Sequence, residues 1–512
     1  MDKNLAQIKY DLCVVGTGPS AYFFILSVLK KHPECKIIVI EAGSRAGTEA
    51  NDVPVSYSGL PPKLSKQWFS GYGGTSNLWH GVLAPMDQID FEKREWVSHS
   101  GWPITLKELE PYYCEASQHL GFDFYETFYA DISVKFGAEA SKLNHSERLT
   151  KKIFYQPKKI LRTHQMFEKL LREKKINILF DCVALEFLCE SPNKSSTVTG
   201  LKVGNSTKKT IETVRSGVYV SCAGCIGSTR LMHNSKNIST GMKNIGKYLM
   251  DHPMGNLAKF QNKNPLNLSI YSQIADNYGM TKIGLRINET LQYKEKTLNS
   301  LFYVRPSYNS RFNIREEQAK LDLITVRAKL KKKELPVSEF LNVLKHPSIF
   351  KQILGYKFGI NAHTRNIDVL YIGEQSPSEA SFLSKSSLRC SWGYPGVNIN
   401  WKISETDSYQ TARTLKEAEM FLTKRNNMIL RESRVADWTS HISSAAHLSG
   451  TLRMAQRSSL GVVDKNLKVF SKKNLYICDG SVLPTIGNAN TTLTLCALSC
   501  RLGKSISLAT KH

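Results

Sequence analysis

The fold is decided by HLSGTLRM (His447–Met454), NLYICDG (Asn474–Gly480) and SVLPTIGNANTTLTLCALSCRLGKSI (Ser481–Ile506). The pattern predicts a loop, a buried strand, a polar crossover rich in Gly and Asn, and a long helix. Two polar side chains, His447 and Asn490, stand beside these apolar elements, where a polar group needs a partner or a function. We therefore interpret this block as a reaction centre.

A second stretch, YDLCVVGTGPSAYFFILSVLKKHPECKIIVIE (Tyr10–Glu41), predicts a strand, a glycine turn, a helix and a second strand ending in an acidic residue. Gly16 permits a tight turn, Gly18 lets backbone approach a pyrophosphate, and Ala21 keeps the helix close to the strand. Glu41 can accept hydrogen bonds from ribose hydroxyls. The stretch predicts a bound adenine dinucleotide, but it does not distinguish FAD from NAD.

The composition is that of a globular protein. The chain has 512 residues, of which 41% are hydrophobic and 22% are charged. It has no apolar run of about 18 residues that would span a membrane, and its first residues lack the pattern of a signal peptide. Its eleven cysteines are scattered along the chain, which favours reduced thiols over a framework of disulfides. We expect a cytoplasmic protein, with a peripheral position at the inner face of the membrane as the alternative.

The net charge is strongly positive. There are 69 Lys and Arg against 44 Asp and Glu, which gives +25. Such a charge favours an anionic partner, either an acidic or phosphorylated substrate or a membrane surface, although a generally basic surface explains it equally well. No nucleic-acid-binding motif accompanies the charge, so we expect no nucleic acid partner.

Between these stretches lies GYGGTSNLWHGVLAPMD (Gly71–Asp87), a loop in which glycine would allow backbone to lie flat against a planar ring. An ordinary surface turn is the alternative. After this loop, Thr105 is the predicted N-cap of a helix, with Glu108 completing a capping box.

Two further segments carry strand patterns. KKINILFDCVALEFL (Lys174–Leu188) is rich in β-branched and aromatic residues, and we include its Val183 among the residues expected to contact the cofactor. VRSGVYVSCAGCIGSTRLMHNS (Val214–Ser235) repeats the order of strand, turn and helix. Cys222 and Cys225 have the spacing of a redox or metal pair, but small residues are also needed for packing at such a turn, so we expect no metal site.

The segment from Val326 to Gly359 combines many lysines with large apolar residues and is broken by Pro336 and Pro347. We expect amphipathic helices that pack on the core and leave their lysines in solvent. The alternative is a surface that docks on a membrane or on an electron-carrying partner.

Together these motifs resemble the glucose–methanol–choline (GMC) oxidoreductase family of flavoproteins. The resemblance rests on VVGTGPSA with Glu41, GGTSNLWHG, CAGCIGSTRLMHNS, IGKYLMDHP, HLSGTLRM, GVVDKNLKVF and the block from Asn474. It is weak between residues 256 and 395, the part that shapes the substrate pocket in this family. DFEKREWVSHSGWPI and the loop at Trp79 are similar to the branch that contains pyranose oxidase and sugar-acid or fructose dehydrogenases.

The resemblance implies an α/β fold with an α+β substrate part. An FAD-binding Rossmann-like domain is assembled from separate chain segments, 1–255 and 441–512, with loop insertions around 46–160. Residues 256–440 form an interleaved substrate-binding domain with a mostly antiparallel sheet.

The resemblance also implies site residues. His447 and Asn490 match the catalytic pair, and the loop with Gly73, Gly74, Ser76, Asn77 and Trp79 matches the one along the flavin. The remaining cofactor-binding positions are Gly16, Gly18, Ala21, Glu41, Asp479, Gly480 and Thr491.

The chain departs from the family pattern at two positions. Leu78 stands where some members link a histidine covalently to the flavin, so we expect non-covalent FAD. Thr491 stands where a proline usually follows the catalytic asparagine, and threonine can also cap or enter a helix.

The predicted reaction is oxidation of a CH–OH group to a carbonyl. The substrate is an alcohol, a polyol or a sugar, and an anionic substrate is one alternative. A neutral His447 takes the hydroxyl proton, Asn490 holds the substrate oxygen, and hydride passes to FAD. We favour a dehydrogenase over an oxidase, with a quinone or a redox protein as electron acceptor. The alternatives are a non-redox, lyase-like flavoprotein, a catalytically idle flavin-binding protein and an NAD-dependent dehydrogenase.

Overall fold

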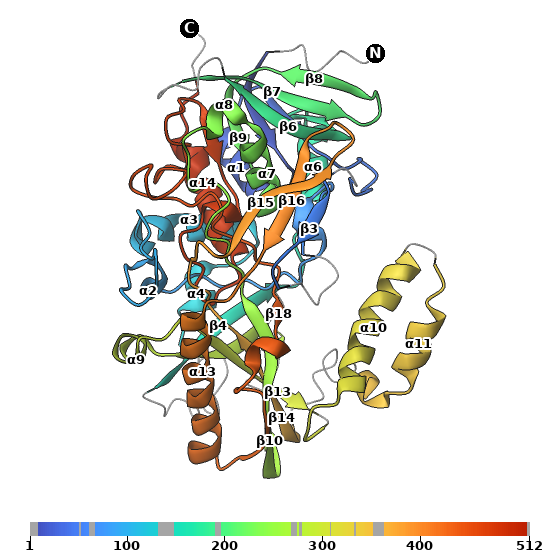
Figure 1. Cartoon of the computed structure of the whole chain (residues 1–512), viewed down its shortest axis with the longest axis vertical. Coiled ribbons are helices and arrows are strands. Elements are labelled where there is room, and N and C mark those ends of the chain that lie inside the picture. The colour runs from blue at the N-terminus through green and yellow to red at the C-terminus, as the bar shows by residue number, and fades with distance from the viewer. Residues whose placement is uncertain are drawn as a thin grey trace.

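The computed structural model describes residues 9–50, 53–60, 67–131, 148–189, 196–267, 274–275, 279–307, 309–331, 334–351 and 363–508. Their helices and strands form an elongated molecule (Figure 1). A parallel sheet lies in the half near both termini, and a large antiparallel sheet lies in the other half.

The parallel sheet is built around β1 and has the strand order β19-β9-β1-β2-β5, with every neighbouring pair parallel. Its strands are β1 (Tyr10–Val15), β2 (Ile37–Ile40), β5 (Asn177–Leu179), β9 (Ser216–Ser221) and β19 (Leu475–Ile477). β1 and β2 are buried on both faces, as a sheet covered by helices requires. Because the strands come from distant parts of the chain, the predicted assembly of a Rossmann-like fold from separate segments is confirmed.

Helices cover this sheet. The helix α1 (Pro19–Lys31) packs on α14 (Thr492–Ser505), which also packs on α3 (Leu106–His119). The capping box predicted for α3 is present. Thr105 Oγ1 accepts a hydrogen bond from Glu108 N at 3.2 Å, and Glu108 Oε2 accepts one from Thr105 N at 2.7 Å.

Two three-stranded sheets flank the parallel sheet (Figure 1). One contains β6 (Cys182–Cys189), β7 (Val198–Asn205) and β8 (Thr210–Val214) in consecutive antiparallel order. The other contains β15 (Phe382–Arg389), β16 (Pro395–Asn400) and β3 (Val55–Tyr57), with β3 parallel to β16.

The antiparallel sheet has the strand order β11-β12-β13-β14-β10-β17, and β4 and β18 pair with β12 and β10. Its strands are β4 (Leu149–Pro157), β10 (Pro253–Asn267), β11 (Ile274–Ala275), β12 (Gly279–Ile287), β13 (Leu301–Ser307), β14 (His363–Ile372), β17 (Ile429–Ser433) and β18 (Ser443–Ser444). The other helices of four residues or more among the described residues, apart from the inserted pair treated below, are α2 (Gln88–Phe91), α4 (Phe124–Phe128), α6 (Thr163–Arg172), α7 (Gly224–Asn234), α8 (Lys236–Ser239), α9 (Glu289–Glu295) and α13 (Glu405–Met420), with the short η2 (Gly74–Asn77), η5 (Phe421–Arg425) and η6 (Trp438–His441). A mostly antiparallel sheet is what the sequence predicts for the substrate half.

The two halves exchange segments. β4 comes from the chain before β6, yet it pairs with β12 along its whole length, from Leu149 to Pro157. β3, from the N-terminal part, pairs with β16. The division into 1–255 with 441–512 and 256–440 remains a prediction, because these strands cross it.

Two helices, α10 (Ile314–Lys331) and α11 (Val337–Leu344), form a pair beside the antiparallel sheet (Figure 1). The prediction that the apolar residues of 326–359 pack on the core is wrong for α11. Its Phe340 and Leu341 are 49% and 53% exposed. Residues 332–333 and 352–359 of the segment lie outside the described residues.

Candidate active site

The glycine turn after β1 lies against the turn after β9. Gly16 has a φ of +97°, and a Cβ there would lie 2.7 Å from the carbonyl oxygen of Cys222, so the position requires glycine. Gly18 is the N-cap of α1, and a Cβ there would meet nothing within 4 Å. No side chain caps this helix end and its first turn holds no acidic residue, which suits an anion. Ala21 is fully buried in the first turn and a half of the helix.

Glu41 follows β2 and is 3% exposed. Its carboxylate accepts hydrogen bonds from Gly43 N at 2.7 Å and from the hydroxyl of Thr17. Burial raises the pKa of Glu41, and these hydrogen bonds oppose the rise. Cys182 N donates to the Glu41 carbonyl at 2.9 Å and so places the neighbouring Val183, which is 2% exposed, beside this strand end.

The predicted flavin loop is fixed over the glycine turn. Gly73 and Gly74 have φ of +93° and +55°, and a Cβ on Gly74 would lie 3.1 Å from Gly18 Cα. Gly73 N donates to Thr17 Oγ1 at 2.8 Å, and Ser76 Oγ donates to the Gly73 carbonyl at 2.6 Å. The loop therefore packs against one side of the glycine turn, while the side of Gly18 on which a Cβ would project has no protein atom within 4 Å.

The other side chains of this loop are anchored away from the glycine turn. Asn77 Nδ2 donates to the Tyr72 carbonyl at 2.7 Å, and Asn77 Oδ1 lies 3.0 Å from His164 Nδ1. Trp79 Nε1 donates to the Leu161 carbonyl at 2.9 Å.

At the end of β19, Asp479 is 3% exposed and fully engaged with protein groups. It accepts hydrogen bonds from the Ser228 hydroxyl and from Ser481 N, the latter at 3.0 Å, and burial raises its pKa. Gly450 N donates to the Gly480 carbonyl at 3.1 Å. Asp479 and Gly480 thus tie α7 and the His447 loop to the parallel sheet.

These residues fit an FAD. The open side of Gly18 at the N-terminus of α1 can take a pyrophosphate, because backbone N–H groups and the helix dipole favour negative charge there. The Glu41 carboxylate at the next strand end can accept ribose hydroxyls. The donor set therefore agrees with the cofactor that the sequence predicts.

His447 and Asn490, which are 43 residues apart in the chain, lie side by side. Asn490 Nδ2 is 3.3 Å from His447 Nε2. Both side chains are half-buried, and Asn490 immediately precedes the turn into α14. Thr491, with φ −66° and ψ −17°, enters the helix in αR conformation and makes no side-chain cap.

A second histidine, His252, fixes the tautomer of His447. His252 Nε2 lies 3.0 Å from the carbonyl oxygen of Gly487, which can only accept, so this nitrogen carries the proton. His252 Nδ1 is therefore an acceptor, and it receives the proton of His447 Nδ1 at 2.9 Å. The network leaves His447 Nε2 unprotonated, on the side of Asn490.

Asp251 holds the backbone of both histidines. Its Oδ1 accepts hydrogen bonds from His252 N at 2.7 Å and from His447 N at 2.9 Å, while its Oδ2 accepts one from the Ser444 hydroxyl. Burial raises the pKa of Asp251 to about 6. The carboxyl is fully buried, so it acts on ring position rather than on solvent-exposed substrate.

Both histidines are held neutral. Burial lowers the pKa of His252 to about 4. Burial and the neighbouring His252 lower the pKa of His447 to about 3. A neutral imidazole whose Nε2 is unprotonated is the form that can accept a proton.

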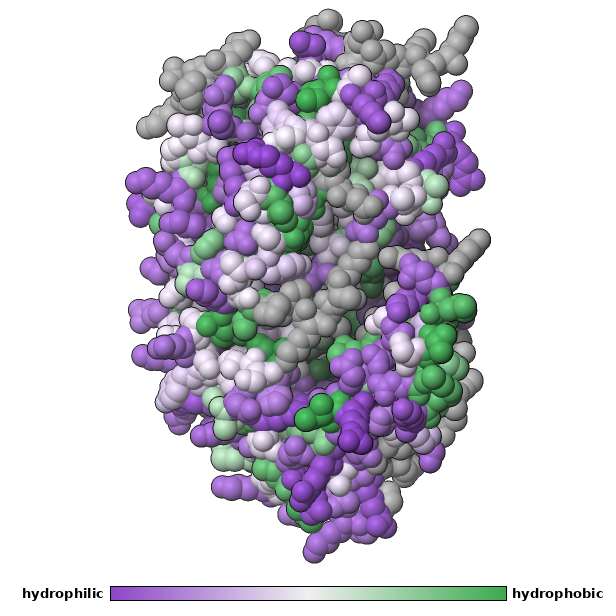
Figure 2. Space-filling model, turned by 45° about the vertical axis from the view of Figure 1, so that its right-hand side comes forward, coloured by the Kyte–Doolittle hydropathy of each residue, from purple (hydrophilic) through white to green (hydrophobic). Residues whose placement is uncertain are grey.

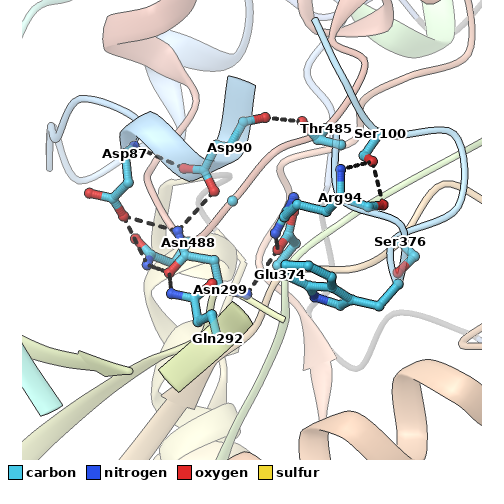
Figure 3. Close-up of polar contacts among 12 residues, drawn as sticks. Asp87, Asp90, Arg94, Ser100, Gln292, Asn299, Glu374, Ser376, Thr485 and Asn488 are labelled. Carbon is cyan, nitrogen blue, oxygen red and sulfur yellow. Dashed lines mark hydrogen bonds and ion pairs between the residues drawn. The ribbon is translucent and has the colours of Figure 1, made fainter. Parts of the chain in front are cut away.

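A buried polar cluster surrounds Asn488, two residues before Asn490. Asp87, Asp90 and Asn299 belong to it (Figure 3), and Lys152 joins it through Asp87 and Asn488. Lys152 Nζ donates to Asp87 Oδ2 and to Asn488 Oδ1, both at 2.8 Å. Asn299 Nδ2 donates to Asp87 Oδ2 at 3.0 Å and to Asp90 Oδ1 at 2.8 Å. Burial would raise the pKa of Asp87, but Lys152 and Arg286 hold it below its usual value.

This cluster fixes the loop that carries Asn490. Asn488 belongs to it directly, and a Cβ on Gly487 would lie 2.2 Å from Asp90 Oδ2. Burial, Asp87 and Glu374 raise the pKa of Asp90 to about 7. The same loop supplies the Gly487 carbonyl that sets the tautomer of His252.

The predicted residues thus fall into two groups. Gly16, Gly18, Glu41 and the 73–79 loop converge at one end of the parallel sheet, and His447 and Asn490 meet near the start of β10. Val183 and Asp479 are buried among protein groups. His252, Asp251 and the polar cluster were not predicted from the sequence. The only signal for the first two is the polar pair within IGKYLMDHP.

Comparison with known proteins supports a flavoprotein fold. Residues 377–499 match the family model described as GMC oxidoreductase. In solved structures, a formate oxidase from Aspergillus oryzae gives a TM-score of 0.56 at 12% identity, covering 97% of this chain and 98% of the other. A pyridoxine 4-oxidase gives 0.53 at 13% identity, again covering 97% and 98%. These likenesses show the shared fold.

Two relatives are similar to this chain in sequence. The 2-methyl-1,2-propanediol dehydrogenase of Mycolicibacterium austroafricanum is 29% identical over 153 residues, 29% of this chain and 26% of that protein. The GMC oxidoreductase family protein Mala s 12 of Malassezia sympodialis is 24% identical over 348 residues, 62% of this chain and 53% of that protein. The matches thus span between a quarter and about half of these relatives. The matched region, the relatives and the shared fold together make the chain similar to the GMC oxidoreductase family, most clearly over residues 377–499.

Proposed function

We propose that the protein binds FAD and oxidises a CH–OH group of a small alcohol, polyol or sugar to a carbonyl, with His447 as the base. One observation carries this proposal. The hydrogen-bond chain from Gly487 through His252 leaves His447 Nε2 without a proton and beside Asn490.

When bound, FAD supplies the two-electron acceptor for the reaction. The Nε2 of His447 accepts the proton of the substrate hydroxyl, and His252 accepts a hydrogen bond from the ring that becomes positively charged. Asn490 Nδ2 donates to the substrate oxygen and holds the carbon in a fixed orientation. Such positioning can lower the barrier by several kcal/mol, up to roughly 7–11 kcal/mol in favourable cases.

The cofactor would be held without a covalent bond. The turn from Gly16 to Ala21 and the carboxylate of Glu41 would bind its pyrophosphate and ribose. The loop from Gly73 to Trp79 would lie along its ring, with Leu78 offering no nucleophile. The N-terminus of α14 after Thr491 carries a partial positive charge that would stabilise an anionic reduced ring. Acid precipitation should release all flavin absorbance to the supernatant; yellow colour in the pellet would contradict non-covalent binding.

We further propose a dehydrogenase that passes electrons to a quinone or a redox protein. The net charge of +25 makes acidic and phosphorylated sugars the first substrates to test. The similar proteins include both a dehydrogenase and an alcohol oxidase, so the acceptor requires a direct measurement.

The deciding experiment is anaerobic bleaching of the bound flavin by a panel of polyols, sugars, sugar acids and long-chain alcohols, followed by admission of oxygen. Bleaching with slow reoxidation by oxygen and fast turnover with a quinone or dye is expected. Rapid reoxidation by oxygen would make the protein an oxidase. A flavin that no alcohol bleaches would remove the redox proposal and favour a lyase-like or idle flavoprotein.

A further inference from the structure

The helices α10 and α11 are an insertion between two neighbouring strands. β13 and β14 pair antiparallel, from Leu301 with Ile372 to Ser307 with Asn366. Antiparallel neighbours are usually joined by two to five residues, yet here the chain leaves at 307 and returns at 363. The sheet does not need this segment for its connection, and long insertions of this kind commonly carry a function.

The inner face of α11 holds it on α10. Val343 is 1% exposed, Asn342 Nδ2 donates to Asp322 at 2.5 Å, and Glu339 pairs with Lys329 at 2.5 Å. The pair is therefore a defined unit with its own packed interior.

The outer face of α11 is apolar and exposed. Val337, Phe340, Leu341 and Leu344 are spaced i, i+3, i+4 and i+7, which places them on one face of the helix. They are 60%, 49%, 53% and 49% exposed, and Leu335, just before the helix, is 85% exposed. We call Leu335 and these four residues the apolar stripe.

The four stripe residues on α11 are the largest group of exposed apolar side chains on a single element among the described residues. Figure 2 shows hydrophobic side chains gathered along the right-hand edge of the molecule, on the side of α10 and α11. A patch of this kind marks an interaction site, because apolar side chains scattered singly need no explanation but a row of them does.

Two exposed lysines, Lys345 and Lys351, follow the stripe in a segment rich in basic residues. Residues 326–359 contain eight Lys and Arg against two Glu. Lys345 directly follows the stripe and is exposed, and Lys351 is exposed next to Phe350, which is itself 38% exposed. An apolar face bordered by lysines matches the layered chemistry of a lipid surface, with acyl chains below anionic headgroups.

We propose that the apolar stripe and its flanking lysines dock the protein on a membrane surface that contains anionic lipid. The stripe enters the headgroup region with α11 lying along the surface, and the lysines contact lipid phosphates. No described helix is long and apolar enough to cross a bilayer, so the contact is peripheral. A protein partner or a second copy would also cover apolar side chains, but the positive border favours anionic lipid. This proposal does not depend on the reaction.

The test is flotation of the full-length, FAD-loaded protein with vesicles of phosphatidylcholine alone or with added phosphatidylglycerol. We expect flotation with the anionic vesicles that weakens as salt is raised. Two variants probe the surface: Phe340→Ser with Leu341→Ser and Leu344→Ser, and Lys345→Glu with Lys351→Glu. The apolar variant should lower the partition coefficient at least tenfold. The charge variant should lower it at least about 20-fold, since each basic residue near such a surface contributes about fivefold.

The matched control is Ile211→Ser with Leu388→Ser. These side chains are 51% and 49% exposed on β8 and β15, outside the inserted helices. The control should float as the unmodified protein does, and all variants should keep the thermal midpoint because every changed side chain is exposed.

Three outcomes would overturn the proposal. The first is no flotation with anionic vesicles, and the second is a stripe variant that floats like the control. The third is sedimentation showing a dimer that the stripe variant converts to a monomer while neither binds vesicles, because a second copy would then cover the stripe.

Discussion

His447 can serve as a base only while its Nε2 carries no proton, and that state depends on His252. Replacing His252 with Ala removes the acceptor for His447 Nδ1–H and frees the ring to adopt the other tautomer. We expect kcat to fall roughly 100-fold, within the range usual for general-base catalysis, with little change in KM. Steady-state kinetics with the best substrate from the bleaching panel checks this.

The control is His252→Asn. The amide oxygen of asparagine can take the position of Nδ1 and accept the same hydrogen bond, so this variant should recover most of the lost kcat. If Ala and Asn reduce kcat equally while both retain FAD, His252 is only a packing residue.

The pH dependence of kcat/KM follows from the burial of His447. Its pKa lies near 3 instead of the ordinary 6.5 because burial and His252 disfavour the charged ring. Protonation of His447 would block the base, so its own titration should lower kcat/KM only below about pH 5. A smaller change near pH 6 would report Asp251, which holds the backbone of both histidines. An acid limb centred at pH 6.5 or above would contradict this.

A loss of activity caused by unfolding at low pH must be distinguished from one caused by protonation of His447. A buried histidine with a lowered pKa binds fewer protons than it does in the unfolded chain. The free energy of unfolding therefore decreases as pH falls below about 6.5 towards the folded pKa. Samples held at low pH and then assayed at pH 7.5 should recover full activity.

At the same scale, the sequence predicted His447 and Asn490 because both are polar residues within apolar surroundings. His252 could not be predicted in this way. Its role depends on a carbonyl at position 487 and a ring at 447, both about 200 residues or more away in the chain, and only folding brings them together.

Among the elements, the glycine turn after β1 allows folding to be tested separately from the proposed binding of FAD. Gly16 has a positive φ, and a Cβ there would contact the Cys222 carbonyl, so Gly16→Ala should destabilise the protein by about 1–3 kcal/mol even without FAD. Gly18 has open space and a φ of −72°. Gly18→Ala should therefore fold normally and weaken only FAD binding.

Differential scanning calorimetry of the FAD-free proteins and flavin titration check this pair. Equal thermal midpoints for both FAD-free variants would contradict the assignment of Gly16 to backbone geometry. Full flavin affinity in Gly18→Ala would place the pyrophosphate elsewhere.

The sequence patterns predicted most of the elements around the parallel sheet, including β1, α1, α14 and the capping box of α3. They predicted α11 as amphipathic but not which way its apolar face points. Helical periodicity reports only that apolar residues share a face, and whether that face meets the core or solvent depends on where the insertion leaves the sheet.

Across the whole molecule, an ion pair joins the two halves. Arg94, between α2 and α3, donates to Glu374, after β14, at 2.8 and 2.5 Å, and both side chains are fully buried (Figure 3). Glu374→Gln leaves the arginine charge buried without its partner. We expect the free energy of unfolding to fall by about 3–5 kcal/mol, measured by urea denaturation.

The control is Arg94→Met with Glu374→Leu, which removes both charges. It should be more stable than Glu374→Gln, because no unpaired charge remains in the interior. Equal destabilisation by the single and double changes would show that the pair contributes through shape rather than charge.

The strand order of the parallel sheet has a consequence for how the protein is made. Four of its strands, β5, β2, β1 and β9, are complete once residue 221 is synthesised, but the edge strand β19 begins only at residue 475. At roughly 5–20 residues per second, translation of the roughly 250 residues between them lasts on the order of 10–50 s. During that interval the outer edge of β9 lacks its partner strand and α1 lacks α14. An open strand edge of this kind is a template for pairing with other chains, so we expect the nascent protein to be most prone to aggregation before β19 is made.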